Sequence, residues 1–337
     1  MMDAVITFGN LQMNPPRGIS IAGFEIYFYG IIIAAGYILA GLYTLKQRDS
    51  YKLSADNVID IFLCAMIGGL VGARLYYVLF NFNDYFGPGK WMNILRVRDG
   101  GLAVYGGIIL GCLLAVLYGR KKKLNLALLL DAAGGAIPIG QAIGRWGNFI
   151  NREAYGYETM LPWKMGLTDA SGVTIYVHPT FLYESLWNVA GFLLLHFFSK
   201  KWKRFNGQIF LMYVLWYGLG RVWIEGLRTD SLYLGGSGIR VSQALAAACI
   251  AVSLVLLIVL GIRSKNKPLE QDAPEGVEDT AEPEMQDTTD DAAETTEEAV
   301  EEPEDLADIS GDETPEDTED APEPEEPESS EEQVEPE

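Results

Sequence analysis

The densest group of polar residues in an otherwise apolar region occupies residues 140–153, with the sequence GQAIGRWGNFINRE. Gln141, Arg145 and Asn148 are spaced i, i+4 and i+7, so they share one face if a helix continues through the segment. A guanidinium offers planar, paired donors that suit a phosphate or a carboxylate. The spacing therefore predicts an anion site, and the alternative is hydrogen bonding between packed helices.

Two further arginines lie in glycine-rich apolar segments. Arg221 and Glu225 are four residues apart, so they can pair on one helix face, and Tyr217 lies one turn before Arg221. The alternative is a structural ion pair at a membrane edge. Arg74 follows a GxxxG pattern, and its side chain either joins a site or reaches the lipid head groups. Glu184 and Asp131 also stand in apolar surroundings and need partners.

Histidine and cysteine are sparse. His178 precedes an apolar stretch and is able to titrate or to donate a hydrogen bond, whereas His196 lies inside such a stretch and is interpreted as structural. Cys64, Cys112 and Cys249 all lie in apolar runs without a CxxC pair. The sequence has no metal-ligand spacing, P-loop, GxSxG or HExxH motif, so we expect no cofactor, no metal and no nucleic-acid partner.

The apolar stretches around these candidate residues are long enough to cross a membrane. A bilayer core about 30 Å thick requires roughly 20 mostly apolar residues per helix. Seven stretches qualify, at residues 24–45, 58–80, 102–118, 124–143, 180–198, 208–224 and 241–262. The sequence thus predicts an all-α polytopic membrane protein with seven transmembrane helices, which makes a soluble protein with buried helices the weaker alternative.

Basic residues set the orientation. Fourteen lysines and arginines follow the first, third, fifth and seventh stretches, in clusters near residues 46–52, 120–123, 200–204 and 263–267. The segments on the other side hold eight, spread over greater length. Because cytoplasmic loops are enriched in Lys and Arg, we expect the N-terminus outside and the C-terminus in the cytoplasm.

The charge of the 337-residue chain has two sources. The formal net charge is −21, yet residues 268–337 contain 32 acids and no bases, which leaves residues 1–267 with a net charge of +11. The predicted organisation is an extracytoplasmic N-terminal segment at 1–23, a seven-helix transmembrane domain at 24–262 and a cytoplasmic, disordered acidic tail at 263–337. The tail is interpreted either as a docking segment or as a dispensable solvated extension.

Residues alone leave two classes open: an enzyme that acts on an anionic lipid, and a transporter or lipid-binding protein. The segment GRWGNFINREAYG at 144–156 resembles the signature of the prolipoprotein diacylglyceryl transferases. Further segments similar to that family occur in the same order: FYG at 28–30, GARLY at 72–76, GGL at 100–102, HPTFLYE at 178–184 and GRVWIEGLR at 220–228. Together they cover about residues 20–262.

The resemblance implies an activity in the bacterial plasma membrane. Members of this family move the diacylglyceryl group of phosphatidylglycerol to the thiol of the lipobox cysteine of a prolipoprotein, the first step of lipoprotein maturation. The products are a thioether and glycerol 1-phosphate. The expected partners are therefore phosphatidylglycerol, prolipoprotein signal peptides and membrane lipid.

The resemblance also implies site residues. Arg145 matches the signature arginine expected to bind the phosphate, and Arg221 matches a second essential arginine. The remaining expected contacts to phosphatidylglycerol are Tyr29, Arg74, Asn148, Asn151, Glu153, Gly156, Tyr217, Glu225 and Arg228.

Tyr105 marks a departure from the family pattern. Some members have His-Gly-Gly where this chain has Tyr105-Gly106-Gly107, and that histidine has been favoured as the base for the thiol. Because an unperturbed tyrosine has a pKa of about 10, it is a poor base at neutral pH. Three interpretations stay open: Tyr105 donates a hydrogen bond, another residue such as His178 is the base, or no dedicated protein base is needed.

Overall fold

The structure is a computed structural model that describes residues 5–87, 89–97, 100–229, 231–233 and 238–265. The chain divides into a unit at Met1–Ala273 and a second unit at Pro274–Glu337. The second unit lies outside the described residues, and so does almost all of the predicted tail.

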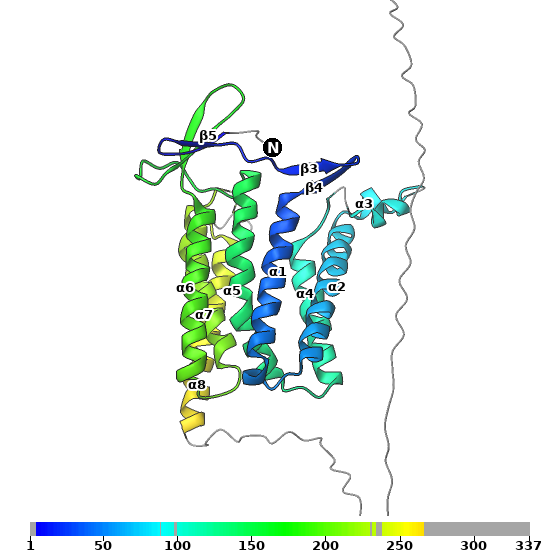
Figure 1. The fold of residues 1–337 in the computed structure, drawn as a ribbon, viewed down its shortest axis with the longest axis vertical. Helices are drawn as coiled ribbons and strands as arrows, with labels where there is room; N and C mark the ends of the chain where they lie inside the picture. The colour runs from blue at the N-terminus through cyan, green and yellow to red at the C-terminus, as the bar shows by residue number, and fades with distance from the viewer. Residues whose placement is uncertain (1–4, 88, 98–99, 230, 234–237, 266–337) are drawn as a thin grey trace, which may run out of the picture. The chain divides into compact units, whose positions relative to one another are not determined.

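The described part of the first unit is mostly helical. Seven long helices run side by side (Figure 1). They are α1 (Phe28–Gln47), α2 (Ala55–Phe80), α4 (Val104–Lys121), α5 (Leu126–Asn151), α6 (Thr180–Lys201), α7 (Gln208–Leu227) and α8 (Val241–Lys265). Six of them, all except α7, are long and apolar enough to cross a membrane. The chain therefore has the features of a multi-pass membrane protein.

Local sequence signals explain where several helices begin and end. The Ser54 side chain accepts a hydrogen bond from the backbone N–H of Asn57 (3.1 Å) and caps α2. The Asn125 side chain likewise accepts from the N–H of Ala127 (3.0 Å) and caps α5. At the far end of α5, Arg152 adopts a left-handed conformation, with φ +53°, and terminates the helix.

Short strands cover one end of the bundle, and the expectation of an all-α fold did not include them. An antiparallel sheet has the order β2–β1–β5–β6, from Leu11–Met13, Val5–Phe8, Met165–Thr168 and Thr174–Val177. Its inner face packs Ile6, Leu167 and Val177 against Phe181 at the start of α6. The strands have only three or four residues, too few for a recognisable alternating pattern.

The first membrane stretch begins later than predicted. Residues Phe24–Tyr27 form β4, which pairs with β3 (Gly18–Ile21), and α1 starts at Phe28. The error arose because an apolar strand that runs directly into an apolar helix cannot be separated from it by hydropathy alone. In Figure 1, β3 and β4 lie at the same end of the bundle as the last turn of α5.

A buried carboxylate anchors the opposite end of the bundle. Asp131 of α5 is fully buried, and the partner that it was expected to need is Lys203, with which it forms an ion pair at 2.9 Å. It also accepts hydrogen bonds from the backbone N–H groups of Gly207 (2.8 Å) and Phe210 (3.1 Å) at the start of α7. This arrangement joins α5 to the α6–α7 connection and fixes the direction in which α7 approaches the site.

The remaining elements are short and connect the bundle helices. They are η1 (Arg48–Tyr51), α3 (Phe82–Tyr85) and η2 (Trp91–Leu95). The segment with α3 and η2 joins α2 to α4, which pack closely through glycines on both helices. Figure 1 shows α3 beyond the end of α2, at the sheet-covered end of the bundle.

Candidate functional site

The first part of the signature segment is helical, because α5 continues to Asn151, and residues 152–156 form a loop after it. Arg145 therefore lies on the last two turns of α5, where it donates from Nη1 to Oδ1 of Asn148 at 3.2 Å. Its second terminal nitrogen, Nη2, lies 2.5 Å from Oε2 of Glu184 on α6. About a quarter of the Arg145 side chain is exposed, so the guanidinium is held in place and remains accessible.

Glu184 is the centre of an arginine cluster. Besides Arg145, its Oε1 lies 3.8 Å from Nη1 of Arg221 on α7 and 3.6 Å from Nη1 of Arg228 just after α7. The Glu184 side chain is 9% exposed, and those of Arg221 and Arg228 are 19% and 12% exposed. Three helices thus bring three guanidinium groups around one carboxylate. Sequence reasoning noted only that this acid needs partners and did not place it in the site.

The predicted Arg221–Glu225 pair is confirmed, with Nη2 and Oε2 2.7 Å apart. Glu225 is almost fully buried, so the loss of Arg221 would leave its side chain without this partner. The backbone carbonyl of Glu225 also accepts a hydrogen bond from Arg240, which lies just before α8. Arg240 in turn donates to the Tyr157 hydroxyl at 3.1 Å. Sequence reasoning did not select Arg240, because its partners lie 15 and 83 residues away.

The amides of the signature form the second part of the site. The side-chain nitrogens of Asn148 and Asn151 both donate to Oε1 of Glu153, at 3.0 and 3.2 Å. The backbone N–H of Glu153 closes the helix end by donating to the Asn148 carbonyl at 3.1 Å. Glu153 thus orients Asn148, and Asn148 in turn accepts a hydrogen bond from Arg145.

Gly156 joins the two halves of the site. Its N–H donates to the His178 carbonyl at 3.0 Å, and it forms a β-bridge with Arg228. A Cβ atom at this position would lie 2.7 Å from the His178 Cβ and 2.8 Å from the Leu227 carbonyl oxygen. Only glycine allows this close approach, which places the signature loop beside the end of α7.

Tyr29 approaches the site from α1. Its ring lies so close to Gly147 of α5 that any side chain there would collide with it. Tyr29 is also near enough to Glu153 and Arg145 to interact with both electrostatically. The structure therefore brings Tyr29 beside the cluster, as the resemblance implied.

The candidate proton-transfer residues are less central. Nδ1 of His178 lies 3.2 Å from the Tyr183 hydroxyl, and that hydroxyl accepts from Trp163 at 2.8 Å. Tyr105 lies in the first turn of α4, and its side chain is 57% exposed.

Tyr217 lies on α7 one turn before Arg221, with its ring 6.1 Å from that of Tyr213.

Arg74 is engaged elsewhere. Its Nε, Nη1 and Nη2 atoms donate five hydrogen bonds, with lengths from 2.6 to 3.0 Å, to backbone carbonyls of the loop between α2 and α4. The acceptors are Asn93, Ile94, Arg96, Gly100 and Gly101. Because these bonds use all five guanidinium N–H groups, Arg74 holds a loop in place and has no donor left for a phosphate.

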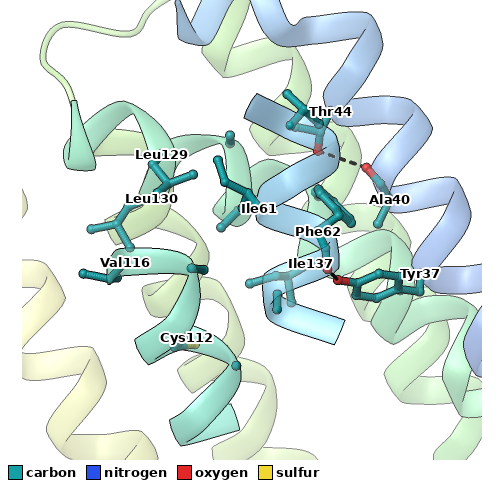
Figure 2. Close-up of a pocket in the computed structure, with 18 of the residues that line it drawn as sticks. Tyr37, Ala40, Thr44, Ile61, Phe62, Cys112, Val116, Leu129, Leu130 and Ile137 are labelled. Carbon is teal, nitrogen blue, oxygen red and sulfur yellow. Dashed lines mark hydrogen bonds between the residues drawn. The ribbon is translucent and has the colours of Figure 1, made fainter. Parts of the chain in front are cut away.

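An apolar cavity of about 770 Å³ lies between α1, α2, α4 and α5. Figure 2 shows Ile61, Cys112, Val116, Leu129 and Ile137 among the residues that line it. Two hydroxyl groups of its wall are bound to backbone carbonyls: the Tyr37 hydroxyl donates to the Phe62 carbonyl at 2.5 Å, and the Thr44 hydroxyl donates to the Ala40 carbonyl at 3.0 Å. Such a wall suits hydrocarbon.

The cavity and the arginine cluster share one helix. Gly140 and Gln141 line the cavity, and Arg145 follows Gln141 by one turn of α5. An amphiphile with a charged head at Arg145 would therefore have an apolar space next to it. The guanidinium groups of Arg145, Arg221, Arg228 and Arg240 and the carboxylates of Glu153, Glu184 and Glu225 together leave one excess positive charge, which suits a singly charged anion.

Comparisons with known proteins agree with this chemistry. A family model described as "Prolipoprotein diacylglyceryl transferase" matches residues 16–259. A phosphatidylglycerol--prolipoprotein diacylglyceryl transferase from Finegoldia magna is 45% identical over 239 residues, which cover 71% of this chain and 93% of the relative. The enzyme of the same name from Clostridioides difficile is 39% identical over 252 residues, covering 75% of this chain and 98% of the relative.

Proposed function

Because the chain belongs to the prolipoprotein diacylglyceryl transferase family, we propose that it transfers the diacylglyceryl group of phosphatidylglycerol to the lipobox cysteine of prolipoproteins. The observation that carries the proposal is the convergence of Arg145, Arg221 and Arg228 close to an apolar cavity of about 770 Å³. The first group suits a phosphate, and the second suits acyl chains.

In the proposed reaction, the cysteine sulfur bonds to the glycerol carbon that bears the phosphate. The bond between that carbon and the phosphate oxygen breaks, and its electron pair leaves on glycerol 1-phosphate. Negative charge therefore grows on the leaving phosphate, and fixed cations aimed at that phosphate lower the barrier. Arg145 and Arg221 are the proposed cations, with Glu225 holding Arg221 and Asn148 holding Arg145.

The neighbouring residues have supporting roles in this proposal. Glu153 orients Asn148 and Asn151, Gly156 allows the signature loop to reach Arg228, and Tyr29 closes the α1 side. Tyr217 belongs to the α7 side of the lipid site. Arg74, by contrast, acts on the loop that precedes α4 and not on the phosphate.

The thiol must lose a proton, since the thiolate is the nucleophile and a free cysteine has a pKa of about 8.5. Tyr105 and His178 remain the two candidate residues for this step. The indole N–H of Trp163 can only donate, so the Tyr183 hydroxyl is the acceptor in their hydrogen bond. The proton of the Tyr183 hydroxyl can therefore point to Nδ1 of His178. In the tautomer that accepts this proton at Nδ1, Nε2 of His178 carries the ring proton and can act only as a donor.

The proposed topology has seven crossings in the bacterial plasma membrane, with the N-terminus outside and the C-terminus in the cytoplasm. The seventh crossing is α7, which packs along α5, α6 and α8 (Figure 1). Its lower hydropathy reflects residues of the site itself, Arg221 and Glu225, at its outer end. The proposed segments are 1–23 outside, 24–262 as the catalytic domain and 263–337 as a cytoplasmic acidic tail.

A direct assay tests the proposal. The purified full-length chain is placed in vesicles that contain phosphatidylglycerol and is incubated with a lipobox peptide. Mass spectrometry should detect a peptide whose mass has increased by a diacylglyceryl group. Binding or flux of lipid without this covalent product would instead support a transporter or a lipid-binding protein.

A further inference from the structure

Glu184 lies among the three arginines of the cluster and already acts as an anion toward each of them. Its Oε2 contacts Arg145 at 2.5 Å, and its Oε1 faces both Arg221 and Arg228. A carboxylate and a phosphate accept from guanidinium groups in similar ways, through two oxygens on one side of the anion. The cluster therefore contains its own anion before any lipid arrives.

The two halves of the carboxylate are bound unequally. The contact with Arg145 has hydrogen-bonding length, whereas the separations of 3.8 and 3.6 Å from Arg221 and Arg228 are longer than a hydrogen bond. At those separations, attraction holds the guanidinium groups near Glu184 without a shared proton. A phosphate can therefore take over these two longer contacts while Glu184 stays bound to Arg145.

The charge balance gives Glu184 a second consequence. Counted at their ordinary charges, the four arginines of the site (Arg145, Arg221, Arg228 and Arg240) and its three carboxylates (Glu153, Glu184 and Glu225) leave one excess positive charge. This excess equals the single negative charge of a phosphodiester. A phosphate monoester carries about −1.5 to −2 at neutral pH. Without the charge of Glu184, the cluster would have two excess positive charges and would match the monoester better than the diester.

We propose that Glu184 is the internal counter-anion of the phosphate site and sets its preference for a lipid phosphodiester over the released glycerol phosphate monoester. Glu184 holds three like charges together in the empty site. Once the carbon–oxygen bond breaks, it repels the extra charge that appears on the leaving phosphate. This inference rests on the proposed function, and it assigns to Glu184 a role in specificity and in product release.

Binding measurements test the inference without any transfer reaction. The full-length chain in detergent is titrated with glycerol 1-phosphate, a monoester, and with glycerophosphoglycerol, the diester head group. At pH 8 the wild type should bind the diester at least as tightly as the monoester. Tighter binding of the monoester by the wild type would overturn the inference, whatever any variant does.

The informative variant is Glu184→Gln, which removes the charge and keeps the shape. It should bind glycerol 1-phosphate about tenfold more tightly, or about 1.4 kcal/mol, while its affinity for the diester changes less. In the vesicle assay, glycerol 1-phosphate should become a correspondingly stronger inhibitor. An equal change for both ligands, or weaker monoester binding by a folded Glu184→Gln protein, would contradict the proposal.

Two further variants separate charge from folding. Glu184→Asp keeps the charge and should keep the diester preference, so a folded Glu184→Asp protein that prefers the monoester contradicts the inference. Glu158→Gln removes the charge of an exposed acid in the loop that follows the signature and should leave both affinities unchanged. A wild type that shows the expected binding preference but transfers no lipid would refute the proposed function and leave the charge argument standing.

Discussion

Replacing Arg74 with lysine should destabilise the protein without weakening its affinity for lipid. Arg74 is 7% exposed and donates five hydrogen bonds to loop carbonyls. Lysine has three N–H donors, so at least two carbonyls lose their partner. A hydrogen bond to a charged group contributes about 1.5–3 kcal/mol, and partial hydration of the loop reduces the loss, so we expect about 3 kcal/mol in total.

Thermal unfolding of the full-length chain in detergent measures this loss. For a folded body of this size, about 3 kcal/mol corresponds to a fall in Tm of roughly 6–12 °C. The KM for phosphatidylglycerol should stay within about twofold of the wild-type value, because the substitution removes no contact with the lipid.

Arg96→Lys is the matched control for Arg74→Lys. Arg96 is an exposed arginine of the same loop. Only its backbone carbonyl contacts Arg74, so changing its side chain keeps that hydrogen bond. This control should leave the Tm unchanged. An unchanged Tm in Arg74→Lys together with a KM raised tenfold or more would refute the reasoning and return Arg74 to the set of phosphate ligands.

Two further substitutions test the packing around the site and the cavity. Gly156→Ala should lower the rate of transfer at least about tenfold, because the added Cβ meets the backbone of Leu227 and overpacking of this kind costs about 1–3 kcal/mol. The control Gly261→Ala should have no effect, because open space surrounds Gly261. Normal transfer by Gly156→Ala would contradict the close approach. Ala115→Phe should raise the KM for long-chain but not for short-chain phosphatidylglycerol, because Ala115 lines the cavity. The control Ala251→Phe, on the exposed face of α8, should change neither KM. Equal effects of Ala115→Phe on both lipids would argue against acyl chains in the cavity.

Much of the helical framework could be predicted from the sequence. Each apolar stretch corresponds to a long helix, because a membrane helix must be apolar over its full length and leaves a strong local signal. The Arg221–Glu225 pair was also predictable, since residues at i and i+4 meet on any helix. The same reasoning placed Arg145 and Asn148 on one face of α5.

Features that depend on long-range contacts could not be predicted in this way. Glu184 belongs to the site because α5, α6 and α7 converge, and its partner Arg145 lies 39 residues away in the sequence. Arg74 and Arg145 are both arginines in glycine-rich apolar segments, and only their acceptors distinguish a residue that holds a loop from a candidate ligand. The short strands β1 and β5 pair although most of the N-terminal half of the chain lies between them in the sequence. A local sequence pattern therefore could not predict this pairing.

The central claim is that Arg145 binds the phosphate of the lipid donor during transfer. The most direct test is the vesicle assay with Arg145→Ala, read by mass spectrometry of the lipobox peptide, with wild type and Arg96→Ala as controls. We predict that Arg145→Ala inserts into the membrane and elutes like the wild type, yet yields no diacylglyceryl peptide. Transfer by Arg145→Ala at the wild-type rate would contradict the account.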